Sequence, residues 1–398
     1  MGAVVDARDT DAVAADGGDP LRQAEARAYR RAGRRRGRVR TALMAVLAVT
    51  AALGGARIAH ALATPGPLPL DAAVYAWAAL AALWLVGLPF ALLGWRAARG
   101  AGLSRQKLPG WLADQAKSLA IGAVIAPLAL WGIVAALRAW PDGWWVAVTL
   151  GSIAVELVFT VVAPVLIVPL FLRSHPLPPG PLADDLSALA ERARVRVGAV
   201  RVLEASEKMS SSNAFVAGIG PTRRIVLFDN LLGDDPDTAR QIAETRSVLA
   251  HEFGHHATGD LWRLSAASAV TTALSLAAVA AALPQLPEAL AHRNAGAFAM
   301  LPALFACTAL TQVVTGIALG AYSRRRERAA DRYGVDLIGD GEPFARALEH
   351  LCATNLAELR PPRSEQWLGA GHPPPYERIA CARSRGKENP TSGANGGL

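Results

Sequence analysis

The sequence predicts a mainly α-helical, polytopic transmembrane helical bundle of about six spans, joined to a cytoplasmic α+β domain that contains a short β-sheet. Three observations support this fold class. Of the 398 residues, 52% are hydrophobic and only 19% are charged, which is too apolar for an ordinary soluble protein of this length. Six apolar stretches approach or reach the roughly 20 residues that a helix needs to cross a membrane. A polar region with both helical and strand periodicity separates the fourth stretch from the fifth.

The first forty residues, 1–40, are expected to form a disordered, basic N-terminal tail. Residues 1–20 are rich in Ala, Asp and Gly and hold almost no large apolar side chains, so they cannot bury enough surface to become ordered. A run of arginines follows before the first apolar stretch. Residues 30–63 also resemble a signal peptide, with a basic start, an apolar centre and the small-residue ending Ala-Leu-Ala. Cleavage there would leave the topology of the later spans unchanged.

The apolar stretches form two groups, with four transmembrane helices within 41–172 and two within 264–321. They lie at 41–63, 74–95, 117–138, 145–172, 264–284 and 297–321. The N-terminal flank, the second loop and the segment after the sixth span are basic, whereas the other three loops carry only Arg293 between them. Because cytoplasmic loops carry an excess of Lys and Arg, both termini and the region 173–263 are expected on the cytoplasmic side of a bacterial cell membrane.

Glu156 lies within the fourth apolar stretch, at a depth where a charge is expensive. Its carboxyl group is either protonated or paired inside the bundle, or it lines an internal polar cavity. The second possibility, together with the number of spans, raises the hypothesis of a transporter. The hydropathy shows no inverted repeat of the kind that many transporters have.

The polar region 173–263 is expected to be the first half of the α+β domain. Residues 182–194 suit an amphipathic helix, and a long helix is expected at 238–258. Short strands are predicted at 198–204, 213–219 and 223–229, the last two joined by the turn residues Gly220 and Pro221. The second half, 322–384, is predicted to hold helices at 322–337, 342–358 and 374–384, followed by a disordered tail at 385–398.

The stretch HEFGH in the long helix has the spacing of a metal site. His251 and His255 are four residues apart, so they project from the same helix face and can reach one ion. In H-E-x-x-H sites the glutamate, here Glu252, is no ligand but the general base that takes a proton from the attacking water. The three cysteines are widely spaced and form no CxxC pair, so any metal must be bound by His and carboxylate. Zinc suits such a donor set.

A third ligand is expected from the stretch SRRRERAAD after the sixth span. Glu327 and Asp331 stand four apart on a predicted helix, so one can bind the metal and the other can accept the proton of a ligand imidazole. Two spans leave and re-enter the same membrane face, which would bring this segment back to HEFGH. His372 is the rival third ligand, whereas His256 points about 100° away around the helix. The alternative interpretation of all these residues is a polar patch on a surface helix and a positively charged flank.

These motifs together resemble the type I CAAX prenyl proteases, integral-membrane zinc metalloendopeptidases of the gluzincin class. The matching blocks are HEFGH, S-R-x-x-E-x-x-A-D from Ser323, SNAFVAG from Ser212, RIVLFDNLL from Arg224 and HPPPYERI from His372. HEFGH alone is a moderately specific signal, but five blocks in this order are a strong one. The family has seven spans where six are counted here, and this difference leaves the shape of its membrane chamber open.

The resemblance implies one zinc ion per chain, bound by His251, His255 and Glu327, with Glu252 as the base and Asp331 behind a ligand. It also implies that the catalytic side chains include two further residues, Arg378 and His372, which could stabilise the tetrahedral oxyanion. Their alternative roles are a solvated charge and a contact at a helix start.

The resemblance further implies that the segment around Asn213, Ala214, Phe215 and Val216 is an edge strand that binds substrate. Backbone pairing at a sheet edge holds a peptide of any sequence in an extended form.

The expected function is therefore that of a membrane-embedded zinc-dependent endopeptidase, which hydrolyses peptide bonds of membrane-associated peptides or proteins. Its partners would be the substrate and the lipid bilayer, and no nucleic acid, because the arginines gather beside apolar runs. No feature of the sequence recognises a prenyl group, and the Ala-, Arg- and Gly-rich composition is typical of high-GC bacteria. The alternatives are a heat-shock-type quality-control protease, which has about two spans ahead of its motif, and a non-catalytic membrane scaffold.

Overall fold

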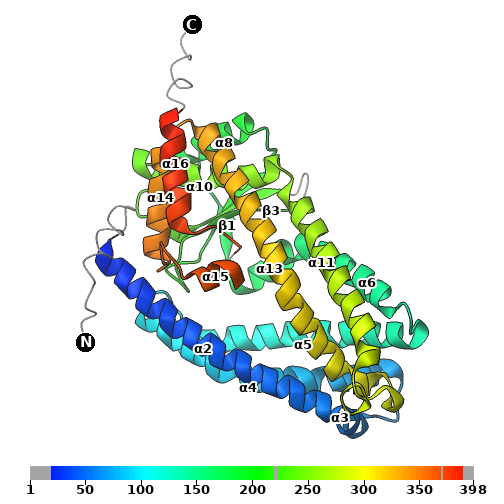
Figure 1. Cartoon of the computed structure of the whole chain (residues 1–398). Helices are drawn as coiled ribbons and strands as arrows, with labels where there is room; N and C mark the ends of the chain where they lie inside the picture. Colours follow the sequence, from blue (N-terminus) through cyan, green and yellow to red (C-terminus); the bar gives the residue numbers. More distant parts are fainter. Residues whose placement is uncertain (1–18, 219–222, 369–370, 389–398) are drawn as a thin grey trace.

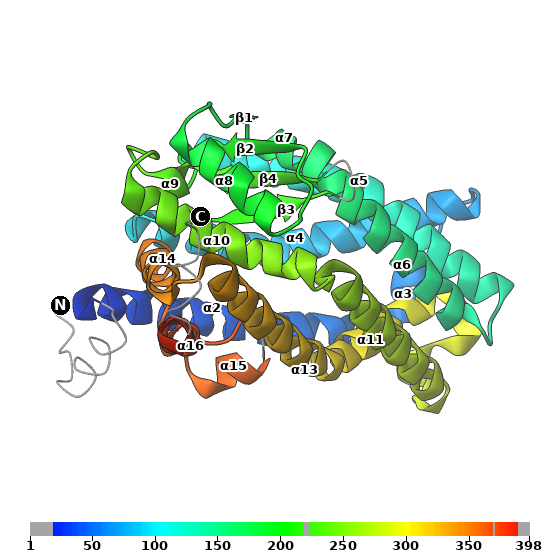
Figure 2. The same cartoon turned by 90° about the horizontal axis from the view of Figure 1, so that it is seen from above.

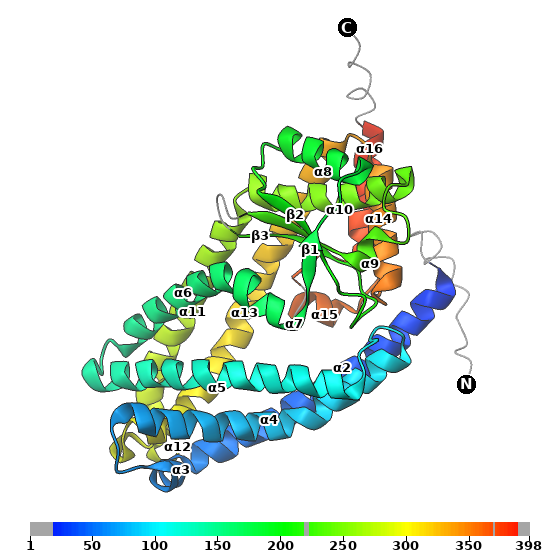
Figure 3. The same ribbon diagram turned by 180° about the vertical axis from the view of Figure 1, so that it is seen from behind.

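The chain folds into a long helical bundle that carries a small sheet and several short helices at one end (Figure 1). The computed structural model describes residues 19–218, 223–368 and 371–388. The mainly helical, membrane-type architecture confirms the predicted fold class. Helices α4 and α5 run below the sheet (Figure 3), and the loop between them contacts the segment that connects β2 to β3, where the Arg105 amide donates to the Lys208 carbonyl. The two long helices α11 and α13 run from the sheet to the opposite end (Figures 1 and 3).

The first helix, α2 (Pro20–Leu53), begins much earlier than expected. The side chain of Asp19 accepts a hydrogen bond from the Leu21 amide and caps the helix start. The expected disordered tail is therefore wrong for residues 20–40, while residues 1–18 lie outside the described part of the chain. Composition could not reveal this helix because the buried Gln23 donates a hydrogen bond to the carbonyl of Ala357, 334 residues away in the sequence.

The expected apolar stretches all coincide with helices, although not all of these are single straight spans. In the described part of the chain, four helices are long and apolar enough to cross a membrane, and the pair α2–α3, bent by 75°, would be a fifth. The stretch 145–172 is instead broken into an α-helix, a π-helical turn that contains Pro164, and one further α-helical turn. The count of six spans therefore remains a prediction. The bounds of these helices are α3 (Gly55–Leu62), α4 (Leu68–Gly100), α5 (Leu108–Ala139), α6 (Trp144–Val162), η1 (Ala163–Ile167), α7 (Val168–Phe171), α11 (Asp260–Ala282) and α13 (Ala297–Ile338).

The sheet has four strands in the order β1-β2-β4-β3, so β3 forms one edge. Its strands are β1 (Ser174–Pro176), β2 (Ala199–Leu203), β3 (Ala214–Ala217) and β4 (Arg224–Phe228). The pair β2–β4 is parallel, and the pairs β1–β2 and β3–β4 are antiparallel. The three predicted strands correspond to β2, β3 and β4, in shorter form. Strand β1 was not predicted, and the expected turn residues Gly220 and Pro221 lie outside the described residues.

Helix α10 lies between the sheet and helix α13 (Figure 2). Leu249 and Phe253 on α10 are fully buried against the same sheet face as Leu227, and α8 covers the rest of that face. The opposite face carries Phe215 and packs against the short helix α7. The bounds of the remaining helices are α8 (Pro181–Arg192), α9 (Asp229–Leu232), α10 (Ala239–Ala257), η3 (Leu283–Gln285), α12 (Glu288–Ala291), η4 (Arg293–Ala295), α14 (Gly341–Thr354), α15 (Arg363–Leu368) and α16 (Pro375–Glu388).

The predicted sixth span and the predicted helix 322–337 are one continuous helix, α13, of 42 residues. Its apolar part belongs to the membrane bundle, and its polar part packs against α10. The stretch SRRRERAAD therefore lies on the same helix as the apolar span before it. The stretch HEFGH, on α10, is joined to the apolar helix α11 by a turn at Gly259.

Candidate metal centre

The stretch HEFGH lies in the last two turns of α10, where one face of the helix is buried. His251 and His255 project from that face, and their Nε2 atoms are 3.2 Å apart. The two rings stand nearly perpendicular, at 83°, so both Nε2 atoms can point at a common position.

Helix α13 places Glu327 beside this pair. Its carboxylate oxygens lie 3.4 Å from Nε2 of His251 and 3.5 Å from Nε2 of His255. Among the described residues this is the one group of three His, Cys, Asp or Glu side chains that could hold a metal ion, and its ligand atoms all lie within 4.8 Å of one another.

The separations fit zinc. Tetrahedral bonds of about 2.0–2.1 Å place two ligand atoms about 3.3 Å apart. The two Nε2 atoms are 3.2 Å apart, and each lies 3.4 or 3.5 Å from a different oxygen of Glu327. The donor set of two imidazoles and one carboxylate is also one that zinc commonly has in catalytic sites. The residues present therefore fit this metal.

Two glycines allow α10 and α13 to approach closely enough for these contacts. A Cβ atom at Gly254 would stand 2.8 Å from the Cα atom of Ala330, and one at Gly334 would stand 3.0 Å from the backbone nitrogen of His251. Each helix thus lacks a side chain at the point where the backbone of the other helix comes closest. The fixed separation of Glu327 from the histidines depends on this fit.

Each candidate ligand histidine contacts a carboxylate through Nδ1, the ring nitrogen on the side away from the proposed metal position. Nδ1 of His251 lies 2.9 Å from Asp331, and Nδ1 of His255 lies 2.8 Å from Asp260. Such partners fix the tautomer and orientation of an imidazole and raise its basicity. The expected partner, Asp331, is in place. Asp260 was missed because the turn at Gly259 separates it from the helix that carries HEFGH, so helical spacing gives no signal for it.

Arginines neutralise both buried carboxylates. The Arg378 guanidinium donates to both oxygens of Asp331, at 2.8 and 2.6 Å, and Arg326 donates to Asp260. Arg378 thus lies on the Nδ1 side of His251, away from Nε2. Arg378 binds Asp331 through Nε and Nη2 and also lines the cavity beside the metal centre, so its expected contact with the oxyanion stays a prediction.

Glu252 has the surroundings of a general base. Burial raises the pKa of its carboxyl group above the usual range, and the neighbouring charges of His251 and His255 oppose this effect. For His251, burial favours the neutral ring, but hydrogen bonds with Asp331 and Glu327 outweigh it and raise the pKa to about 9. Glu252 also lines the cavity beside the metal centre, and its role as general base stays a prediction.

The other two histidines of the motif blocks differ in their surroundings. Nδ1 of His372 lies 2.7 Å from Glu327, while its side chain remains 67% exposed at the cavity wall. His372 therefore approaches the carboxylate and not the histidine pair. Burial lowers the pKa of His256 to about 4, and this neutral ring is not part of the group that could hold a metal.

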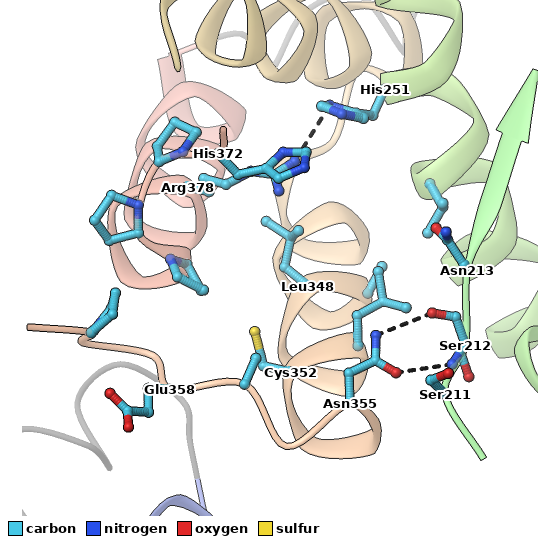
Figure 4. A pocket seen from close by; sticks show the side chains of 18 of the residues that line it. Ser211, Ser212, Asn213, His251, Leu348, Cys352, Asn355, Glu358, His372 and Arg378 are labelled. Carbon is cyan, nitrogen blue, oxygen red and sulfur yellow. Dashed lines mark hydrogen bonds between the residues drawn. The ribbon is translucent and has the colours of Figure 1, made fainter. Parts of the chain in front are cut away.

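A cavity of about 550 Å³ extends from the metal centre along the start of β3 and the face of α14 (Figure 4). Asn213 lines it, and Ala214 is buried at the beginning of the edge strand. The ring of Phe215 packs against Phe228 on the other face of the sheet, so this side chain does not face the cavity. Of the four residues expected to bind substrate, Asn213 is the one that lines this cavity, and pairing of a peptide with the β3 backbone stays a prediction.

Glu156 lies away from this site, on α6. Ser268 on α11 donates a hydrogen bond to it at 3.2 Å. This contact corresponds to the interpretation of a carboxyl group paired inside the bundle.

Residues 176–386 match the sequence profile of Peptidase family M48, and residues 21–173 match the profile described as CAAX prenyl protease N-terminal, five membrane helices. The metalloprotease YhfN of Bacillus subtilis is 28% identical over 306 residues, which cover 75% of this chain and 70% of that protein. The CAAX prenyl protease 1 homolog of Caenorhabditis elegans is 26% identical over 312 residues, covering 71% of this chain and 70% of that protein.

The fold is similar to that of Ste24p from S. mikatae. The TM-score to its crystal structure is 0.78 at 21% sequence identity, over 92% of this chain and 89% of that one. At this identity the similarity concerns the fold alone.

Proposed function

This chain belongs to Peptidase family M48 and carries the membrane domain of the CAAX prenyl proteases, and from that premise we propose that it is a zinc endopeptidase whose metal is held by His251, His255 and Glu327. Membership makes the chain a multi-pass membrane metallopeptidase. Our proposal concerns the identity of the metal, the role of each residue and the choice of substrate. One observation carries it: donor atoms of His251, His255 and Glu327, from two helices, lie 3.2 to 3.5 Å apart, close to the spacing that zinc requires.

The proposed chemistry assigns each step to a side chain of this protein. Zinc, when bound, supplies the positive charge that polarises the peptide carbonyl and lowers the pKa of water to about 7. Glu252 takes the proton from the attacking water and passes it to the leaving amine. His372 stands at the cavity wall, where it can donate a hydrogen bond to the oxyanion. The β3 backbone holds the peptide extended.

Asp331 and Asp260 act on the reaction through the histidines. Each accepts the Nδ1 proton of one imidazole and so leaves its Nε2 free for the metal. Arg378 keeps the Asp331 carboxylate in place by two hydrogen bonds. We assign Arg378 this holding role.

The proposed substrates are membrane-associated peptides or proteins, cleaved at the cytoplasmic face of a bacterial cell membrane. The basic flanks beside the apolar helices support this orientation. The match of residues 21–173 to the CAAX prenyl protease N-terminal region favours this architecture over the heat-shock type. A reporter fused to the C-terminus should be active in the cytoplasm, and activity outside the membrane would reject the orientation.

Glu252→Gln separates metal binding from catalysis. The purified variant should retain about one zinc per chain by elemental analysis and lose cleavage of a fluorogenic peptide by at least about 100-fold, the usual effect of removing a general base. Glu327→Ala is the matched variant, which should lose metal as well as cleavage. Full activity of Glu252→Gln with bound zinc would exclude the proposed base.

A further inference from the structure

The free edge of β3 can be assigned residue by residue from its pairing with β4. The amide of Phe228 donates to the carbonyl of Asn213 at 2.9 Å, and the register continues with Phe215 opposite Val226. In an antiparallel ladder the residues alternate, so the backbone groups of odd-numbered residues on this strand face β4. The backbone groups of Ser212, Ala214 and Val216 therefore face the open edge, where an extended peptide would pair; the Ala214 N–H already donates to Oδ1 of Asn213 at 2.9 Å.

The first of these three positions is already occupied. The Asn355 side chain accepts a hydrogen bond from the Ser212 amide at 2.9 Å and donates one to the Ser212 carbonyl at 3.1 Å (Figure 4). A peptide residue paired with Ser212 would make the same two bonds. The primary amide of Asn355 thus takes the place of one residue of a paired strand.

Asn355 is held in this position by the chain around it. It follows the last residue of α14, and the next residue, Leu356, has a left-handed backbone with φ of 45°. Arg30 of α2 donates to the Leu356 carbonyl at 3.2 Å. Gln23 donates to the Ala357 carbonyl at 3.0 Å and accepts from the amide of Leu359 at 2.9 Å.

We propose that Asn355 is a specificity-determining residue that ends the substrate-pairing edge of β3. The proposal rests on the proposed function, since it concerns the peptide that this peptidase cleaves. A bound peptide pairs with Val216 and with the carbonyl of Ala214, whose N–H is bonded to Asn213, and then meets the Asn355 amide at Ser212. Beyond that point it has no free backbone partner and turns into the cavity.

The surroundings of that turn are mainly apolar. Leu348 and Cys352 on α14 line the cavity between the metal centre and Asn355, with Glu358 farther along (Figure 4). A peptide that leaves the edge at Ser212 places its next side chains against these residues. On this side of the cleaved bond, lengthening the substrate should therefore raise kcat/KM only slightly.

Asn355→Ala tests the proposal as a gain of binding. Two fluorogenic peptide series share one core and are lengthened by one to four residues, either at the N-terminal or at the C-terminal end. For wild type, kcat/KM should reach a plateau in one series. In Asn355→Ala the lengthened peptides of that series should improve by about tenfold relative to the short one, the ratio expected from two regained peptide hydrogen bonds.

Two further variants separate this effect from a loosened strand. Asn230→Ala is the matched control, because the Asn230 amide holds the carbonyls of Met209 and Ser211 behind the same segment and makes no bond at the edge. It should keep the wild-type plateau. Asn355→Asp can still accept from the Ser212 amide but cannot donate to the Ser212 carbonyl, so its effect should lie between wild type and Asn355→Ala.

The proposal is overturned if lengthening has the same effect in Asn355→Ala as in wild type, or if all three variants improve alike. It is also overturned if wild type shows no plateau in either series. These outcomes differ from failure of the proposed function, in which wild type and Glu252→Gln would cleave the core peptide equally.

Discussion

Gly254→Ala is predicted to weaken metal binding without touching any ligand. Gly254 lies one residue before His255 on α10, and its Cα faces Ala330 on α13. Glu327 is carried by α13, three residues before Ala330. A methyl group at position 254 must therefore push apart the two helices that the metal centre joins.

The size of the effect follows from the contact distances. The new Cβ would lie 2.8 Å from the Cα and carbonyl oxygen of Ala330, whereas carbon atoms in favourable contact are at least about 3.5 Å apart, so the helices must separate by about 0.7 Å. Metal–ligand distances tolerate only about 0.2 Å. Overpacking of this kind costs about 1–3 kcal/mol. If Glu327 yields to relieve the strain, the dissociation constant for zinc rises by about 5- to 150-fold.

The assay is competition of the purified, metal-free protein with a chromophoric chelator for zinc. Gly316→Ala is the matched control on α13, because a Cβ atom there meets no atom within 4 Å. It should bind zinc as wild type does. Thermal unfolding of the metal-free variants identifies any general loss of fold. Wild-type zinc affinity in a folded Gly254→Ala protein would refute the link between close helix packing and the metal centre.

Three further results are expected. Asp260→Ala frees the Nδ1 side of His255 and should weaken zinc binding about 10- to 100-fold, measured by the same chelator competition. Hydrogen bonds raise the pKa of His251 to about 9, so the metal-free ring should be protonated at pH 7.5. Zinc binding should then release about one proton. Calorimetry in buffers of different ionisation enthalpy measures this number. His372→Ala should lower kcat about 100-fold with unchanged zinc content; loss of zinc would identify His372 as a ligand.

Local spacing predicted the parts of the site that lie on one helix. His251 and His255 are related by one helical turn, and so are Glu327 and Asp331, so periodicity alone places each pair on one face. The approach of the two pairs to each other was expected from the two intervening spans. In the structure, Glu327 lies 3.4 Å from His251 and 3.5 Å from His255. No local sequence pattern could predict these distances, because they depend on the packing of α10 against α13.

Contacts between distant segments were missed. Arg326 was expected to be only a positively charged flank, yet its guanidinium pairs with the buried Asp260 across the α11–α13 hairpin. Gln23 lay in a segment whose composition is typical of disorder, and its order depends on backbone groups near Leu359. Asn355 belongs to no motif, since its role depends on where a loop after α14 meets β3. These partners lie from 66 to 336 residues apart, beyond any local period.

The close helix packing also explains why the membrane part and the metal centre form one unit. α13 carries an apolar stretch and Glu327 on a single 42-residue helix, and α11 begins at Asp260, which holds His255. A shift of either span along the membrane normal would therefore move a ligand or the partner of a ligand. Since a displacement of about 0.2 Å already impairs a metal bond, zinc binding should depend on correct insertion of both spans. Detergents or lipids that tilt this hairpin should release the metal before the sheet unfolds.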